Sequence, residues 1–469
     1  MIEGMKDVLA ERYASSDMKA IWSPESKVLE ERKFWISLLR AQARSGVLIP
    51  ELEIEKYAQV AADINLDSIR KRESVLLHDV KARIEEFNAL AGSQLIHLGM
   101  TSRDLTENIE LLQIKKSLEL LQKNYLGLTF LLNQKAVKHS SQLLVARSHN
   151  IPAQLTTLGK RFSIFVEEML FSFERLSNLI ERLPLRGIRG PVGTASDMIE
   201  IVGSDYFRAL EDSMVQELGF NRVLDSTGQI YPRSVDFEIL STLVQLASGP
   251  SSFATTLRLM SGHGLANEGF AENQVGSSAM PHKMNPRSSE RINGLIKVLR
   301  GFLTMVSETT GDQWNEGDVS CSVVRRVAIP GAFFAIDGVV QTLASVINGL
   351  IVSEEILSRE VDSELPFLAS SKLMLAAVTK GLGREDAHRL VKGHAVSTLQ
   401  SAESSRGSRF IRGLADDPSF PMNELEIDSI VQRERTLVGE AMEQVKRVDS
   451  KVKILTKKYP YSVNFESII

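Results

Sequence analysis

The sequence predicts an all-α protein, and three observations support this fold class. Proline, which interrupts helices, is absent between Pro50 and Pro152 and again between Pro286 and Pro330. Apolar residues recur at alternating four- and three-residue spacings in two long stretches. Strand signals are weak, because period-two alternation is short and β-branched residues do not cluster for long. Long helices with little sheet are therefore expected.

Two stretches carry the helical spacing. The first contains Ile114, Leu118, Leu121, Tyr125, Leu128 and Leu132. The second contains Phe162, Val166, Met169, Phe173, Leu176, Ile180 and Leu183. Such spacing places the side chains on one stripe of a helix, as in bundles and coiled coils. Other faces are also apolar, for example at Leu111 and Phe165, which predicts burial in a large bundle, often one completed by other subunits.

Three helical domains are expected along the chain. An N-terminal domain covers residues 1–100, a central long-helix bundle covers 101–352, and a C-terminal helical domain covers 353–469. Residues 184–194 and 225–233 are rich in Gly and Pro or in polar turn formers, and we interpret them as structured connections.

Composition narrows the class of protein. The chain has 469 residues, and its 43% hydrophobic and 24% charged content is that of an ordinary globular protein. A net charge of -4 gives no reason to expect a nucleic-acid partner. The single cysteine, Cys321, excludes an intramolecular disulfide and a cysteine-based zinc site. No secretory signal and no run of about 18 apolar residues is apparent, so a cytoplasmic protein without a membrane partner is expected.

The most distinctive segment is residues 276–286, GSSAMPHKMNP. Its glycine and prolines disfavour regular structure, and its polar side chains suit a mobile loop of an active site. Lys283 and Asn285 could direct donors at a carboxylate, while Ser277 could meet a proton on the neighbouring carbon. An ordinary surface turn is the alternative for a Ser-Ser pair taken alone.

Three histidines have polar surroundings that suit a site. His149 lies between two predicted long helices, where an imidazole can titrate near neutrality. His78 precedes Asp79 on an amphipathic stretch, for which a structural role is the alternative. His97 opens the segment HLGMTS, in which Thr101 or Ser102 can cap the following helix and leave free amides for an anion. We find no phosphate-loop, dinucleotide, metal or α/β-hydrolase motif.

Several motifs together resemble the adenylosuccinate lyase family of the fumarase/aspartase superfamily. They occur in order as ERYASSDMKAIWS (11–23), HDV (78–80), HLGMTS (97–102), SHNIPAQLTTLGKR (148–161), TGQIYPR (227–233), the loop at 276–286 and ELPFLAS (364–370). The loop identifies only the superfamily, whereas the RYAS start, TGQxYxR and the Thr-Thr after His149 indicate the family.

The resemblance implies an activity and an assembly. It implies a helical homotetramer whose active sites take residues from three subunits, without metal or organic cofactor. The implied reactions release fumarate from adenylosuccinate, giving AMP, and from succinylaminoimidazole carboxamide ribotide (SAICAR), giving its amide product AICAR. The implied partners are therefore small nucleotide substrates.

The same resemblance assigns roles to residues of this chain. Ser277 would be the general base, with Ser278 as the alternative, and His149 the general acid. Lys283 and Asn285 would stabilise the dianionic intermediate, and His78 with Asp79 would assist at the nucleotide or leaving-group side. The succinyl carboxylates would be held or oriented by Thr101, Ser102, Thr157 and Gln229. Phosphate and ribose would be bound by Arg12, Tyr13, Arg233, Ser322 and Arg326.

One departure from the family pattern concerns the phosphate side. Gly317 stands where most members have an arginine, and Cys321 replaces a frequent histidine. A cation is therefore missing or comes from elsewhere, with Arg325 as the candidate. Another superfamily lyase, such as argininosuccinate lyase or the related cycloisomerase, is the alternative enzyme, and a helical scaffold without activity is the non-enzyme alternative.

Overall fold

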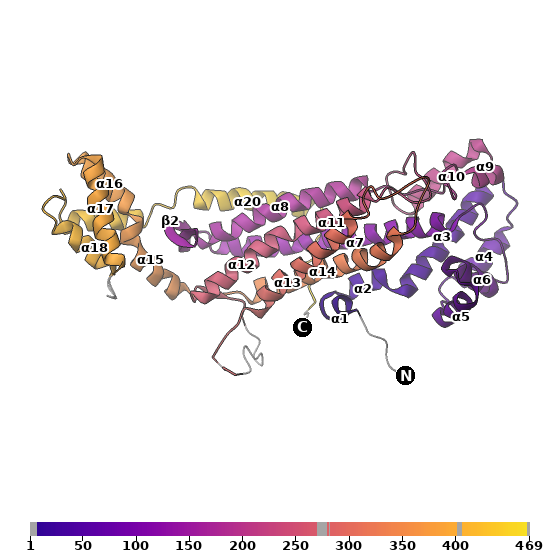
Figure 1. Cartoon of the computed structure of the whole chain (residues 1–469), viewed down its shortest axis with the longest axis horizontal. Coiled ribbons are helices and arrows are strands. Elements are labelled where there is room, and N and C mark those ends of the chain that lie inside the picture. Colours follow the sequence, from indigo (N-terminus) through magenta and orange to yellow (C-terminus); the bar gives the residue numbers. More distant parts are fainter. Residues whose placement is uncertain (1–6, 270–278, 281, 401–405, 467–469) are drawn as a thin grey trace.

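The computed structural model describes residues 7–269, 279–280, 282–400 and 406–466. It is an elongated helical molecule, with α5 and α6 at one end and α16–α18 at the other (Figure 1). This confirms the all-α prediction. In the described residues, strands are confined to two short two-stranded sheets.

The N-terminal helices pack against one end of the bundle. Their bounds are α1 Val8–Tyr13, α2 Ser16–Trp22, α3 Pro24–Arg44, α4 Glu51–Gln59, α5 Leu66–Leu76 and α6 Asp79–Ala91. Ser23 caps α3, which has Pro24 in its first turn, where a missing N–H costs nothing. Buried residues of this region, among them Trp35 and Tyr57, are continuous with the core of the central bundle.

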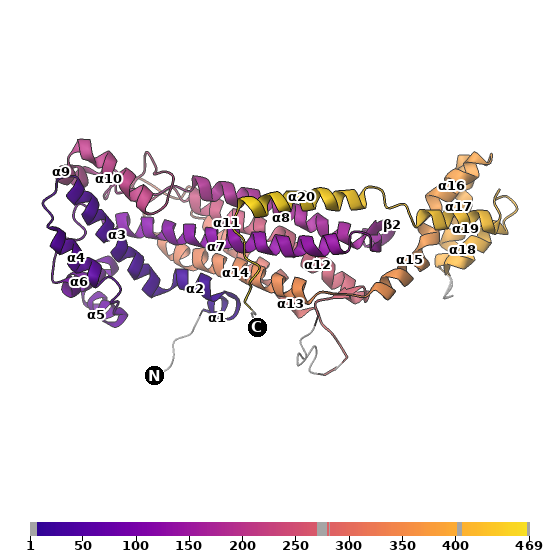
Figure 2. The same cartoon turned by 180° about the vertical axis from the view of Figure 1, so that it is seen from behind.

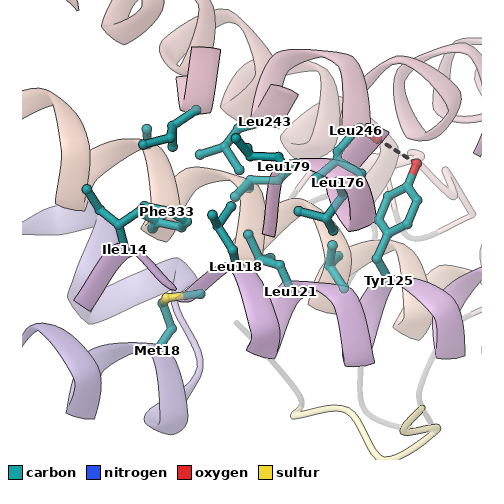
Figure 3. Packing of buried hydrophobic residues seen from close by; sticks show 14 of the residues in the cluster. Met18, Ile114, Leu118, Leu121, Tyr125, Leu176, Leu179, Leu243, Leu246 and Phe333 are labelled. Carbon is teal, nitrogen blue, oxygen red and sulfur yellow. Dashed lines mark hydrogen bonds between the residues drawn. The ribbon is translucent and has the colours of Figure 1, made fainter. Parts of the chain in front are cut away.

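The central bundle lies along the long axis of the molecule. Its elements are α7 Ser102–Lys138, β1 Leu143–Ser148, β2 Ile151–Thr157, α8 Leu158–Arg182, α9 Ser196–Val202, α10 Ser204–Glu217, α11 Ser234–Leu246, α12 Ser248–Gly262, β3 Ala266–Asn267, α13 Arg287–Ser307, α14 Cys321–Gly349 and β4 Ile351–Val352. Both predicted apolar stripes fall on long helices, α7 and α8, and pack into one core (Figure 3). Within the α7 stripe, the buried Tyr125 hydroxyl donates to the Leu246 carbonyl at 2.8 Å.

The C-terminal helices form a second core and then return to the first. They are α15 Glu354–Leu368, α16 Ser370–Thr379, α17 Arg384–Leu399, α18 Arg406–Ala415, α19 Glu424–Glu434 and α20 Ala441–Lys458. Helices α15–α19 share a core of their own. Helix α20 instead runs back along α7 and α8 and places Val445 and Val452 in the central core (Figure 2). The apolar face of α20 is therefore buried by the central bundle, although the helix lies within residues 353–469.

Helix α14 is long and apolar enough to cross a membrane by length and composition alone. Since 89% of its most apolar window is buried inside the protein, the bundle core explains this composition. The region around His149 is not a simple helix junction but a β-hairpin, in which Leu143 pairs with Thr157 and Ser148 with Ile151.

Candidate active site

Five predicted residues come together where α6, α7 and α14 meet. His78 is the N-cap of α6, and its Nε2 lies 3.4 Å from the Ser102 hydroxyl in the first turn of α7. Asp79 lies between His78 and Arg326 of α14, with closest atoms 3.8 and 3.7 Å apart. Ser322 lies one turn before Arg326 on α14. Its hydroxyl accepts a hydrogen bond from Arg103, the residue after Ser102, which brings Ser322 into the group. We call this set of His78, Asp79, Ser102, Ser322 and Arg326 the junction cluster.

The junction cluster is accessible and carries both signs of charge. Three of its side chains are partly exposed, at 50% for His78, 39% for Asp79 and 68% for Arg326, so a ligand can reach them. Burial alone would raise the pKa of Asp79, but the charges of Arg83 and Arg326 and the Val80 amide lower it. Asp79 is therefore ionised at neutral pH and holds the cations beside the imidazole.

A buried carboxylate fixes the start of α7. Asp104 accepts hydrogen bonds from the amides of Thr101 at 2.7 Å, Arg189 at 2.8 Å and Gly190 at 3.0 Å, and it pairs with the Arg186 guanidinium. Both charged side chains of that pair have no exposed surface. Thr101 and Ser102 are thus presented by a helix end that the connection at 184–194 holds in place.

His97, adjacent to the cluster, is neutral. Burial lowers its pKa to about 4, and the nearby charges of His78 and Lys81 contribute in the same direction. The Trp35 indole donates to its Nδ1 at 3.1 Å, which requires an unprotonated acceptor nitrogen. His97 also has a positive φ of 70°, so it supports the bend that leads into Thr101.

Arg233, predicted to bind the ligand, lies in the core. Its guanidinium donates to both carboxylate oxygens of Glu107 at 2.8 and 2.9 Å and stacks on the Tyr231 ring at 4.3 Å. Its side chain has no exposed surface. Arg233 therefore cannot contact a ligand directly in this structure. Its bonds to Glu107 instead support α7, the helix that carries Ser102.

Arg325, the candidate replacement for the missing cation, is buried as well. Its side chain is only 3% exposed and pairs with Asp236 at 2.8 Å and with Glu110. Burial alone would lower its pKa, but the charges of Asp236, Tyr231 and Glu110 outweigh it and raise the pKa. Arg325 thus neutralises carboxylates of the core and keeps little of its side chain accessible.

A second group of predicted residues lies at α1 and at the start of α13. Arg12 is exposed and Tyr13 half-buried, with the Tyr13 ring 5.9 Å from the Arg291 guanidinium. Arg291 was missed in the sequence, where it is one of many helical arginines. Lys283 is exposed and Asn285 half-buried just before α13. Ser277 and Ser278 lie outside the described residues.

A third group is the hairpin. His149 and Asn150 form its two-residue turn, both with positive φ, as a type I′ turn requires. Val145 and Leu155 anchor the strands in the C-terminal core, so the exposed imidazole sits on a fixed support. Thr157 is 1% exposed and caps α8 by accepting from the Lys160 amide at 3.1 Å. In this structure the side chain of Thr157 therefore serves as the N-cap of α8.

Gln229 packs against the segment that contains Gly317. Its amide donates to the Glu316 carbonyl at 2.6 Å. Its half-buried side chain lies over Gly317. Among the described residues, no group of three or more His, Cys, Asp or Glu side chains could hold a metal ion.

The junction cluster and the hairpin are far apart in one chain. Helix α7 has 37 residues, so it is roughly 55 Å long at 1.5 Å per residue. The junction cluster lies at its first turn, whereas the hairpin follows its last, and Figure 1 shows β2 at the end opposite to α5 and α6. A complete set of predicted residues therefore does not assemble within one chain.

Comparisons with known proteins show the family of the chain. A family model described as lyase matches residues 9–301, and one described as adenylosuccinate lyase C-terminus matches residues 366–448. The chain is 30% identical over 448 residues to the adenylosuccinate lyase of Saccharomyces cerevisiae, covering 94% of this chain and 92% of that one. It is 32% identical over 399 residues to the enzyme of Schistosoma mansoni, covering 84% and 83%.

A solved structure shares the fold. The 3-carboxy-cis,cis-muconate lactonizing enzyme from Pseudomonas putida superposes with a TM-score of 0.82 at 19% identity, covering 96% of this chain and 100% of that chain. At this identity the likeness concerns the fold alone.

Proposed function

The chain belongs to the adenylosuccinate lyase family, and on this premise we propose that it releases fumarate from adenylosuccinate and from SAICAR, giving AMP and AICAR. Each substrate carries a phosphate and two succinyl carboxylates, so the site must offer cations and donors at more than one place. An argininosuccinate lyase would not need cations for a phosphate.

The observation that carries this proposal is the junction cluster. It combines an accessible imidazole at His78, hydroxyl groups at Ser102 and Ser322 and an exposed guanidinium at Arg326. The end of α7 adds unpaired amides and a positive dipole, which favour an anion. Because the helix end is fixed by buried Asp104, the donors are preorganised for the ligand.

The proposed reaction is a β-elimination. Ser277 removes a proton from the succinyl methylene carbon, which is adjacent to the nitrogen-bearing carbon, and the electrons pass into the carboxylate attached to that methylene. The C–N bond then breaks, fumarate forms, and His149 gives a proton to the leaving nitrogen. Lys283 and Asn285, which precede α13, stabilise the doubly charged intermediate by donating to its oxygens. The charge of Lys283 also favours the serine alkoxide.

We infer that a site of this kind is completed by other subunits in a homotetramer. His149 and the junction cluster are separated by the length of α7, so one chain cannot offer both to one substrate. Long helices also leave large apolar side chains exposed, including Phe171 at 69%, Val323 at 70% and Val327 at 51%. Burying these residues between subunits would remove apolar surface from water.

The remaining proposals concern cofactors and location. The elimination needs only proton transfer and charge stabilisation, so we propose that the enzyme uses no metal or organic cofactor. We further propose a cytoplasmic enzyme whose partners are small nucleotides, without membrane or nucleic-acid partners.

Turnover of adenylosuccinate tests the proposed function. The purified protein should change the ultraviolet absorbance of adenylosuccinate and release fumarate and AMP in equal amounts, with Ser277→Ala as the inactive control. SAICAR should react as well. Absence of fumarate from both substrates, with release from argininosuccinate, would assign the chain to a sister activity.

A further inference from the structure

Arg103 lies beside the junction cluster and bridges two of the helices that form it, α7 and α14. It is the second residue of α7, next to Ser102, and its Nη2 donates to the Ser322 hydroxyl of α14 at 2.9 Å. Its Nη1 donates to Glu107 at 3.3 Å. The side chain remains 18% exposed. The guanidinium therefore connects two helices at the accessible surface of the cluster.

Two other arginines near the junction cluster, Arg233 and Arg325, already pair with buried carboxylates. Arg233 forms two bonds of 2.8 and 2.9 Å to Glu107, and Arg325 pairs with Asp236 and Glu110. Neither side chain is more than 3% exposed. Because Glu107 already accepts two hydrogen bonds from Arg233, its longer hydrogen bond from Arg103 is the weaker interaction. Arg103 can thus turn donors toward a ligand at little cost.

Position 317 cannot supply a cation without rearrangement. A Cβ added at Gly317 would lie 2.8 Å from the Cβ of Gln229, which is too close for two carbon atoms. The backbone of Gln229 cannot easily yield, because its amide is bonded to the Glu316 carbonyl at 2.6 Å. A cation that replaces the one missing at position 317 therefore has to come from another element.

We propose that Arg103 is this cation and binds the substrate phosphate together with Ser322 and Arg326. The inference rests on the proposed function and adds a residue of substrate recognition to it. The contact with Ser322 already places a guanidinium and a hydroxyl side by side, and a planar guanidinium can offer two parallel donors to phosphate oxygens.

Substitution of Arg103 separates phosphate binding from chemistry. Steady-state kinetics with adenylosuccinate should give an Arg103→Gln variant whose KM rises roughly ten- to a hundredfold, as expected for losing hydrogen bonds to a charged group. The effect should fall mainly on KM, with a smaller change in kcat. Inhibition by inorganic phosphate should weaken by a similar factor, whereas inhibition by fumarate, which has no phosphate, should not.

Two variants serve as controls. Arg103→Lys keeps the charge but loses the paired donors, so its KM should fall between those of wild type and Arg103→Gln. Arg70→Gln removes an arginine from α5 that is 70% exposed and pairs with Asp67 three residues earlier, so its kinetics should match wild type. Unchanged KM and phosphate inhibition in a folded Arg103→Gln protein would overturn the proposal. Equal weakening of phosphate and fumarate inhibition would overturn it too, because that result indicates a positioning role.

A thermal-shift experiment keeps this test separate from the proposed function. Inorganic phosphate should raise the Tm of the wild-type protein, because a ligand that binds only the folded state stabilises it. The increase should be much smaller for Arg103→Gln and intact for Arg70→Gln. If wild type does not react with adenylosuccinate but this pattern holds, the proposed function fails while Arg103 remains an anion-binding residue. An equal phosphate shift in all three proteins would overturn the role of Arg103.

Discussion

The Ser102 hydroxyl lies 3.4 Å from Nε2 of His78, although the two residues belong to different helices. Nδ1 of the same imidazole accepts from the Lys81 amide at 3.3 Å, so His78 caps α6 and faces α7 at once. This arrangement fixes which nitrogen faces the site. A ring that accepts at Nδ1 carries its proton at Nε2, where it can donate to Ser102 or to a ligand.

Ser102→Ala should impair turnover without loss of stability. The hydroxyl is a ligand donor in the proposed site, and losing one bond to a charged group lowers kcat/KM by roughly ten- to a hundredfold. Its neighbour Thr101 keeps the bond to Asp104, so Tm should remain within a few degrees of wild type. Kinetics and thermal melts of the same preparation check both statements. A normal kcat/KM would remove Ser102 from the site.

Ser277→Ala should abolish turnover, whereas Ser278→Ala should leave measurable activity. Only the proposed base must lose a proton in each cycle, and a neighbouring hydroxyl can at most donate a hydrogen bond. Fumarate release measured for both variants distinguishes them. Equal residual activity in the two would contradict the assignment of the base.

His149→Gln and His78→Gln should each be nearly inactive, but a mixture of the two should regain activity. If each site draws its His149 and His78 from different subunits, mixed tetramers contain some sites with both native residues. The experiment is to mix the variants, dissociate and reassociate the subunits, and measure fumarate release. The unmixed variants treated in the same way are the control. No recovery in verified mixed tetramers would place both residues in one subunit.

His97 should make the protein less stable in acid. Its pKa is about 4 in the folded protein against an ordinary value of 6.5, so between these values the unfolded chain binds a proton that the folded protein does not. The free energy of unfolding therefore falls as the pH drops through this window. From about pH 7.5 to about pH 5 the loss is on the order of 2 kcal/mol.

A His97→Asn variant isolates that contribution. Asparagine tolerates positive φ and has no proton to gain, so the variant should lose less stability on acidification than wild type. Denaturant unfolding at the two pH values gives the difference. Parallel losses in both proteins would show that other groups cause the acid sensitivity.

Arg186→Met should destabilise the protein by about 3 to 5 kcal/mol, because it leaves the fully buried charge of Asp104 without its partner. It also removes bonds to the carbonyls of Gly190 and Gly228, both at 2.8 Å. Arg389→Met is the matched control, since Arg389 is 69% exposed and its ion pair with Asp386 contributes little. Denaturant unfolding compares the two. Equal stabilities would mean that the Asp104 pair does not hold α7.

Sequence reasoning predicted the long helices because burial follows their periodicity closely. Leu118, Leu121 and Tyr125 are spaced as a helical stripe, and all three are fully buried in the core. It did not predict the hairpin, because a short strand that ends in Arg147 and Ser148 has no clean alternation of apolar and polar residues. Its turn conformation and its anchoring in the C-terminal core are set by packing rather than by local sequence.

The sequence by itself determined the family, the helical class and the residue types available for elimination chemistry, because motifs and periodicity are local properties. Only the tertiary structure decided which of those residues a ligand can reach. Arg233 and Arg325 look like Arg103 and Arg326 in the sequence, yet the first two are buried against carboxylates, whereas the side chains of the last two are 18% and 68% exposed. That distinction depends on Glu107, Glu110 and Asp236, which come from other helices, and only folding brings them within reach of the guanidinium groups.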